Sequence, residues 1–244
     1  MKVQKHWLDE EKNAYFTEFL LDDYTEFQQG KKRPAVIVCP GGGYQFVSQR
    51  EGEPVALHFL KEGYQAFVLN YTVGSPENGN VLKTAICQAA QLIAYIRDNC
   101  DALFVDPDKI AIIGFSAGAH LSASLSVNHK QAWLKEMAGT GQTNLRPDAC
   151  ILSYTWVSMQ AMNDRMAAVD AEPNTCEYMP QANIAMIGHP DPIGEGFEIC
   201  SPYLLVDEDT PPTYIWHTSN DELVFVECSL DYARALSDHR VPFE

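Results

Sequence analysis

Short apolar runs alternate with amphipathic segments along most of the chain, beginning near residue 34. Runs rich in β-branched and aromatic residues, which are typical of strands, occur at 35–39, 65–71, 109–113, 149–154 and 213–217. Apolar residues at helical spacing occur between these runs, at 54–61, 81–99, 119–127 and 226–239. This alternation predicts an α/β fold, in which a mostly parallel central sheet carries helices on both faces.

The regular alternation is interrupted between residues 156 and 200. Methionines, prolines, glycines and acidic residues mix there without a clear period, over more residues than a simple connection needs. The segment is either a lid over a pocket or an irregular surface excursion, and its pattern does not separate these alternatives. Because no repeat or linker divides the chain, we expect a single domain over residues 1–244.

Composition and charge narrow the class of protein and of partner. The chain has 33 acidic and 17 basic residues, a formal net charge of −16, and 46% hydrophobic residues. This hydrophobic content is typical of a globular protein, and the charge disfavours nucleic acid and anionic membrane surfaces as partners. No run approaches the roughly 20 apolar residues of a membrane span, and residues 1–11 do not resemble a signal peptide. We therefore expect a soluble protein.

The seven cysteines are odd in number and scattered, and no Cys-x-x-Cys pair suggests zinc. This usage favours a reducing, cytoplasmic location. The histidines show no metal-ligand spacing, so we do not expect a catalytic metal. The pattern leaves open whether copies of the chain form a homo-oligomer.

Gly114-Phe115-Ser116-Ala117-Gly118 carries the strongest chemical signal. This G-x-S-x-G lies directly after the strand that ends near Ile113 and directly before a helical run. A strand-to-helix turn of this kind presents the serine hydroxyl at the carboxyl edge of the sheet, where a helix N-terminus favours developing negative charge. Ser116 is therefore the candidate nucleophile, and a plain glycine turn is the alternative.

A second glycine cluster follows the strand at 35–39, in Pro40-Gly41-Gly42-Gly43-Tyr44. Consecutive glycines let backbone N–H groups approach a ligand without obstruction by side chains. We expect the N–H groups of Gly42, Gly43 and Ala117 to form an oxyanion hole. A glycine turn without function and a phosphate-binding loop are the alternatives, but neither accounts for the serine turn downstream.

The candidate acid follows the strand at 213–217, where Asp221 and Glu222 lie at the strand's carboxyl end. Asp221 is the first choice and Glu222 the second. Its carboxylate would hold the Nδ1–H of a histidine, fix the tautomer and stabilise the imidazolium. A solvated acidic loop is the alternative.

The chain resembles the small lipase/esterase group of the α/β-hydrolase superfamily, which includes acetyl-xylan-esterase-like, BD-FAE-like and kynurenine-formamidase-like members. The resemblance covers residues 33–244. It rests on Arg33-Pro34-Ala35, Pro40-Gly41-Gly42-Gly43-Tyr44, Arg50-Glu51-Gly52-Glu53-Pro54, Gly114-Phe115-Ser116-Ala117-Gly118, Ser201-Pro202, Thr210-Pro211-Pro212, Trp216-His217-Thr218 and Asp221-Glu222-Leu223-Val224.

The sequence departs from these relatives at two places. Pro40 stands where many have the histidine of His-Gly-Gly-Gly, which leaves the backbone donors intact, and Ala119 replaces a glycine before His120. The resemblance implies an α/β-hydrolase fold and a serine hydrolase without a cofactor.

The general base is the missing member of the triad. In this fold the order is serine, acid, histidine, and only His239 follows Asp221. His239 ends the helix that precedes the last strand, so we do not expect it to be the base. His120 is expected to pack at the helix–sheet boundary, and His217 to shape the acid loop.

The resemblance implies that residues 241–244 begin the final strand, and that a histidine loop and a closing helix, about 30 residues in all, follow Glu244. The chain is thus expected to lack its last strand–loop–helix unit. A protein that ends at Glu244 should be nearly inactive.

The expected function is a serine carboxylesterase that hydrolyses small acyl esters, including acetylated sugars, through an acyl-enzyme on Ser116. An amidase, arylformamidase or peptidase on the same scaffold is the first alternative. The second is a catalytically inactive hydrolase fold used for binding.

Overall fold

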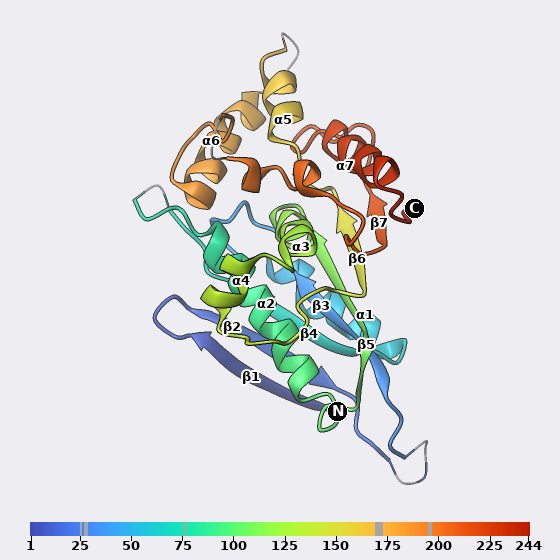
Figure 1. The fold of residues 1–244 in the computed structure, drawn as a ribbon. Coiled ribbons are helices and arrows are strands. Elements are labelled where there is room, and N and C mark those ends of the chain that lie inside the picture. The colour runs from blue at the N-terminus through green and yellow to red at the C-terminus, as the bar shows by residue number, and fades with distance from the viewer. Residues whose placement is uncertain (25, 27–28, 76, 169–172, 195–196) are drawn as a thin grey trace.

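Seven strands form one sheet in the computed structural model of the chain (Figure 1), which describes residues 1–24, 26, 29–75, 77–168, 173–194 and 197–244. The strand order is β1-β2-β4-β3-β5-β6-β7. The strands are β1 Lys2–Asp9, β2 Ala14–Leu20, β3 Arg33–Cys39, β4 Gln65–Asn70, β5 Val105–Phe115, β6 Ala149–Ser153 and β7 Thr213–Trp216. The helices are α1 Glu53–Lys61, α2 Leu82–Asp98, α3 Ala117–Asn128, α4 Ala132–Ala138, α5 Met159–Met166, α6 Pro173–Ile187 and α7 Glu227–Asp238.

The sheet is parallel from β4 to β7, and β1 and β2 form an antiparallel hairpin beside β4. The predicted mostly parallel sheet with helices on both faces is confirmed. The hairpin was not predicted. Most of β1 is exposed at the edge of the sheet, so its sequence contains no apolar run of the kind that marks the buried strands.

Alternate residues of β3 face opposite layers. Val36 and Val38 pack in a cluster with Ala56 and Leu60 of α1, whereas Ile37 belongs to the larger cluster that includes α2 and α3. Helices therefore cover both faces of the sheet. Because both faces of β3 are buried, its sequence is a continuous apolar run.

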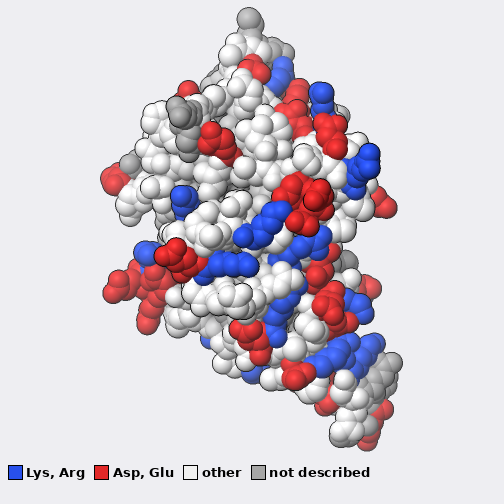
Figure 2. All heavy atoms as spheres, viewed as in Figure 1, with Lys and Arg blue, Asp and Glu red and all other residues white. Residues whose placement is uncertain are grey.

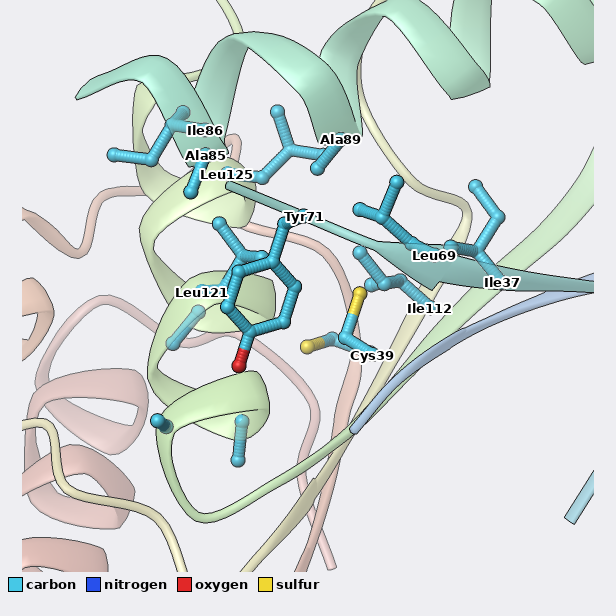
Figure 3. Packing of buried hydrophobic residues seen from close by; sticks show 14 of the residues in the cluster. Ile37, Cys39, Leu69, Tyr71, Ala85, Ile86, Ala89, Ile112, Leu121 and Leu125 are labelled. Carbon is cyan, nitrogen blue, oxygen red and sulfur yellow. The ribbon is translucent and has the colours of Figure 1, made fainter. Parts of the chain in front are cut away.

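The larger cluster also positions the end of β3. Figure 3 shows Tyr71 between Leu121 of α3 and Cys39 of β3, with Ile86 and Ala89 of α2 above it. The Tyr71 hydroxyl donates a hydrogen bond to the carbonyl oxygen of Pro40 at 2.8 Å. Core packing thus holds the backbone at the point where the glycine cluster begins.

The described part of residues 156–200 is largely helical rather than irregular. It contains α5, α6 and the short 3-10 helix Glu198–Cys200, while residues 169–172 and 195–196 lie outside the described residues. Met179 and Met186 of α6 are buried in the main cluster. The carbonyl oxygen of Ala185 accepts the N–H of Asn80 at 3.0 Å, which ties α6 to the loop after β4.

Residues 242–244 pair with β7 after the end of α7. The N–H of Ile215 donates to the carbonyl oxygen of Glu244 at 2.8 Å, and Phe243 forms a parallel bridge with Thr213. This backbone lies where the sequence predicted the start of a strand.

The surface carries charges of both signs. On the face shown in Figure 2, acidic and basic side chains are interspersed over the lower and middle parts of the molecule. None of the helices in the described ranges combines the length and apolar character needed to cross a bilayer.

Candidate active site

Ser116 occupies the turn between β5 and α3 in a conformation that side chains rarely adopt. Its φ is +52° and its ψ is −118°, outside the ordinary regions for a residue with a Cβ. Two hydrogen bonds hold it there: its N–H donates to Ser153 of β6 at 3.0 Å, and its carbonyl oxygen accepts from His120 at 2.9 Å. Such strain persists only where the surroundings enforce it, and it concentrates at functional sites.

The two glycines that flank Ser116 are required by close packing. A Cβ on Gly114 would lie 2.1 Å from the carbonyl oxygen of Gly118, and a Cβ on Gly118 would lie 2.0 Å from that of Cys39. No larger residue fits at either position without moving backbone. The G-x-S-x-G spacing therefore has a structural cause, which is the tight passage of the turn against β3.

Ser116 opens into a cavity of about 780 Å³. Gly42 and Asp221, two other predicted site residues, line the same cavity. The three residues come from the loops after β5, β3 and β7, whose carboxyl ends meet at one edge of the sheet. The structure thus brings the predicted nucleophile, one predicted oxyanion donor and the predicted acid to one place.

The glycine loop has the backbone that an oxyanion hole needs. Gly42 and Gly43 have φ of +130° and +59°, and the Gly42 carbonyl accepts from Gln45 at 2.9 Å to close a turn. Ala117 is the first residue of α3, so its N–H has no partner within the helix. Gly43 and Ala117 do not line the cavity, although each adjoins a residue that does.

Asp221 is oriented by its own loop. Its Oδ1 accepts the N–H groups of Leu223 and Val224, both at 2.9 Å, while its Oδ2 lies 3.6 Å from Nε2 of His217. Glu222 is exposed and does not line the cavity. The geometry therefore favours Asp221 over Glu222 as the acid.

His120 and His217 already use both ring nitrogens. His120 is fully buried, with Nε2 3.0 Å from the carbonyl oxygen of Cys200 and Nδ1 2.7 Å from the Tyr44 hydroxyl. Burial lowers the pKa of His120 to about 4. His217 donates from Nε2 to the carbonyl oxygen of Val224 and accepts at Nδ1 from Ser229, both at 2.7 Å. Each ring nitrogen of these two histidines thus has a hydrogen-bond partner other than Ser116.

His239 caps the C-terminus of α7 and is exposed. Among the described residues that line the cavity, none is a histidine. The cavity therefore brings together the predicted nucleophile and the predicted acid, and no imidazole is present among its described lining residues.

The further residues that line the cavity were not predicted as site residues, among them Glu51, Tyr154 and Tyr178, whose carboxyl and hydroxyl groups come from different parts of the chain. Burial, together with the nearby Glu51 carboxylate, raises the pKa of Tyr154, so its hydroxyl stays protonated. Glu51 lies in one of the stretches that carried the resemblance, and Tyr154 directly follows β6, so both had a weak signal. Tyr178 comes from α6, where the sequence pattern offered none.

Known proteins resemble this chain in sequence and in fold. Endo-1,4-beta-xylanase B from Butyrivibrio fibrisolvens is 31% identical over 212 residues, which are 87% of this chain and 31% of that protein. The chain spans less than half the length of the curated relatives that it matches.

Two solved structures cover the whole chain. One is a carboxylesterase from Lactobacillus plantarum, with a TM-score of 0.78, 26% identity and 81% of its own chain covered. The other is an acetyl ester-xyloside bifunctional hydrolase from Caldicellulosiruptor lactoaceticus, with a TM-score of 0.78, 29% identity and 84% of its chain covered.

These likenesses confirm the α/β-hydrolase fold and the resemblance to esterases of that superfamily. Residues 21–236, most of the chain, match the BD-FAE family, and the chain belongs to this family.

Proposed function

We propose that the protein is a serine carboxylesterase that works through an acyl-enzyme on Ser116. The Ser116 hydroxyl attacks the ester carbonyl, and the N–H groups of Gly42, Gly43 and Ala117 hold the oxyanion. A histidine oriented by Asp221 takes the serine proton and passes it to the leaving alcohol. A water molecule, deprotonated by the same histidine, then attacks the acyl-enzyme and releases the carboxylic acid product and Ser116.

The strained backbone of Ser116 is the observation that carries this proposal. A serine at φ +52°, held between two glycines that tolerate no side chain, has no advantage for packing alone. At the junction of strand and helix, the same conformation points the hydroxyl toward a cavity that also contains an acid and a glycine loop. A structural glycine turn would need neither of these.

Asp221 supports the acid role because only one of its oxygens is committed to the backbone. With Oδ1 held by two N–H groups, Oδ2 is the oxygen that would accept from the histidine. His217 lies 3.6 Å from Oδ2, and its Nε2 is directed to Val224 instead. We assign it the role of supporting the acid loop.

Small neutral acyl esters, including acetylated sugars, are the proposed substrates. The formal charge of −16 disfavours anionic esters, and one of the solved structures that this chain resembles is an acetyl ester-xyloside bifunctional hydrolase. Tyr178 of α6 lies at the cavity and against Gly43, which supports a role for the segment 156–200 in covering the site. No cofactor enters this mechanism.

Labelling by a fluorophosphonate probe tests the nucleophile. We expect the full-length protein to be labelled at Ser116 and Ser116→Ala to be unlabelled and at least about 10³-fold less active. Ser237→Ala, which removes an exposed hydroxyl of α7, is the matched control and should be labelled normally. Unchanged labelling of Ser116→Ala would rule out this nucleophile, and a wild-type protein that never labels would favour a binding module.

Substrate comparison then separates the related activities. Hydrolysis of p-nitrophenyl acetate faster than of longer esters, together with release of acetate from acetylated sugars, is the expected result. Faster turnover of N-formylkynurenine would instead favour the arylformamidase.

We also propose a reducing, cytoplasmic location, because all seven cysteines are free thiols. Cell fractionation with thiol labelling would test it. Recovery of the protein outside the cell with paired cysteines would contradict the proposal.

A further inference from the structure

Two acidic side chains are buried among the residues that the structure describes, Glu18 and Glu51. The Glu18 carboxylate is balanced by Lys2 at 2.7 Å and is also 3.2 Å from His6. Glu51 lies instead at the active-site cavity, and its basic neighbour Arg50 is a highly exposed side chain with Nε 3.5 Å away. A buried carboxylate is costly unless hydrogen bonds satisfy it, so the contacts of Glu51 are informative.

Both oxygens of Glu51 bind segments of the proposed site. Oε2 accepts the N–H of Gly41 at 2.8 Å, and Oε1 accepts the hydroxyl of Tyr154 at 3.2 Å. Gly41 precedes the proposed donors Gly42 and Gly43 in the chain, and Tyr154 follows β6. The carboxylate thus joins the loops that follow two different strands of the sheet.

Gly41 lies directly against the nucleophile. A Cβ on Gly41 would be 3.1 Å from the Ser116 Cβ, 2.8 Å from the carbonyl oxygen of Phe115 and 2.9 Å from Oε2 of Glu51. The carboxylate, the Gly41 backbone and the serine turn therefore form one packed unit without room for another atom. A shift of the Gly41 backbone would change the distance between the glycine loop and Ser116.

Both polar groups of Gly41 are held. Its carbonyl oxygen accepts the N–H of Ser48 at 3.0 Å, and its N–H donates to Glu51, whose own N–H donates to Ser48 at 3.3 Å. A hydrogen bond to a carboxylate is charge-assisted and stronger than one to a neutral acceptor. This closed arrangement determines the direction in which the following peptide groups point.

We infer that Glu51 is a positioning residue of the oxyanion hole: it holds the Gly41 peptide so that the N–H groups of Gly42 and Gly43 face the oxyanion formed at Ser116. The inference rests on the proposed esterase function. Removal of one oxyanion donor lowers kcat about 10²- to 10³-fold, and misplacement of a donor should lower kcat by a similar factor. Because these donors bind the oxyanion more strongly than the ground-state carbonyl, the loss should fall mainly on kcat.

The test compares Glu51→Ala and Glu51→Gln in the full-length protein, with p-nitrophenyl acetate as substrate and active sites counted by fluorophosphonate titration. Glu51→Ala should lower kcat per active site about 10²-fold with KM within about 3-fold of wild type. Glu51→Gln keeps an oxygen that can accept the Gly41 N–H and should recover most of the rate. Glu62→Gln, an exposed acid after α1, is the control.

A thermal melt decides whether each variant is folded at the assay temperature. If Glu51→Ala is not folded, Glu51→Asp carries the test, because its side chain is one methylene shorter, should no longer reach the Gly41 N–H and should therefore also lower kcat per active site. A second readout, hydrogen exchange of the Gly41 amide, does not need activity. We expect faster exchange in Glu51→Ala than in wild type or Glu62→Gln. Faster exchange together with the selective loss of kcat would support the inference.

An unchanged kcat per titrated site in folded Glu51→Ala would overturn the inference while leaving the esterase proposal intact. An equal loss of kcat in Glu51→Ala and Glu51→Gln would overturn it too. The inference is that the side chain holds the Gly41 peptide in place, and the amide oxygen of Gln should also do so. If the wild-type protein neither labels nor turns over esters, the proposed function fails and the catalytic role of Glu51 fails with it; the two failures are therefore distinguishable.

Discussion

The conformation of a single residue, Ser116, separates a hydrolase turn from an ordinary turn. The residue keeps a strained φ because the first hydrogen bonds of α3 and the bond to Ser153 enforce it. Gly114 and Gly118 make room for this turn, since a Cβ on Gly114 would lie 2.1 Å, and a Cβ on Gly118 2.0 Å, from a backbone carbonyl oxygen. The conformation of the proposed nucleophile therefore depends on two glycines that pack against backbone.

Gly118→Ala is expected to be strongly destabilising. The new Cβ would lie 2.0 Å from the carbonyl oxygen of Cys39, and backbone must move to relieve the overlap, at a cost of about 3 kcal/mol or more. Urea unfolding measures the loss of stability. Gly139→Ala is the control: it has φ +65° but open space, so only strain of about 1 kcal/mol is expected. Similar losses in both variants would contradict this packing argument.

At the scale of elements, α6 is the part of the segment 156–200 that contacts the loops of the proposed site. Tyr178 projects from α6 to the cavity, and a Cβ on Gly43 would lie only 2.2 Å from its hydroxyl oxygen. Thr175, near the start of α6, donates a hydrogen bond to the carbonyl oxygen of Glu222 beside the acid. The helix thus contacts both the glycine loop and the acid loop, which suits an element that shapes the substrate site.

Tyr178→Ala should enlarge the site for the acyl group. Because one or two methylenes in a pocket change discrimination by about 10-fold or more, we expect kcat/KM for butyrate relative to acetate esters to rise about 10-fold. Steady-state rates with the two p-nitrophenyl esters measure this ratio. Glu177→Ala, an exposed neighbour on the same helix, should leave the ratio unchanged. An unaltered ratio in Tyr178→Ala would exclude a contact with the acyl chain.

At the scale of the whole molecule, a buried polar network joins parts of the fold that are distant in sequence. His120 of α3 connects the Tyr44 hydroxyl in the glycine loop with the carbonyl oxygen of Cys200. Since Nε2 donates to a carbonyl, Nδ1 accepts from Tyr44, and the neutral ring satisfies both partners. A protonated ring would lose the bond from Tyr44 and bury a charge.

Stability should therefore depend on pH through His120. Its pKa is about 4 in the folded protein, against 6.5 as its ordinary value, because burial disfavours the charged form. The contribution of neutral His120 to the free energy of unfolding is complete above about pH 6.5. It is lost as the pH falls toward 4, because in this range the unfolded chain binds a proton at His120 that the folded chain does not. The loss over this window is about 3 kcal/mol.

Denaturant unfolding at several pH values measures this effect by comparison with His120→Asn. The variant should be less stable at pH 7 and should show a flatter decline between pH 6.5 and 4, while the carboxylates and His129 contribute to both proteins alike. Parallel declines would mean that His120 does not titrate in this window.

Local sequence determined much of this protein. The strand–turn–helix around Ser116 follows from a continuous apolar run, two glycines and a helical pattern, all within about 20 residues, so it could be predicted without the fold. The parallel sheet likewise follows from the alternation of runs after residue 34. The sequence also favoured Asp221 over Glu222, but support for this choice came only from the cavity, which Asp221 lines and Glu222 does not.

Only the tertiary structure decided the rest, because it depends on contacts between distant segments. The pairing of Glu51 with Gly41 and Tyr154, and the approach of Tyr178 to Gly43, join residues from separate elements, and no local pattern encodes such distances. The edge strand β1 was hidden because exposure removes the apolar run that marks a buried strand. Local propensity specifies which turn forms; packing decides which side chains that turn meets.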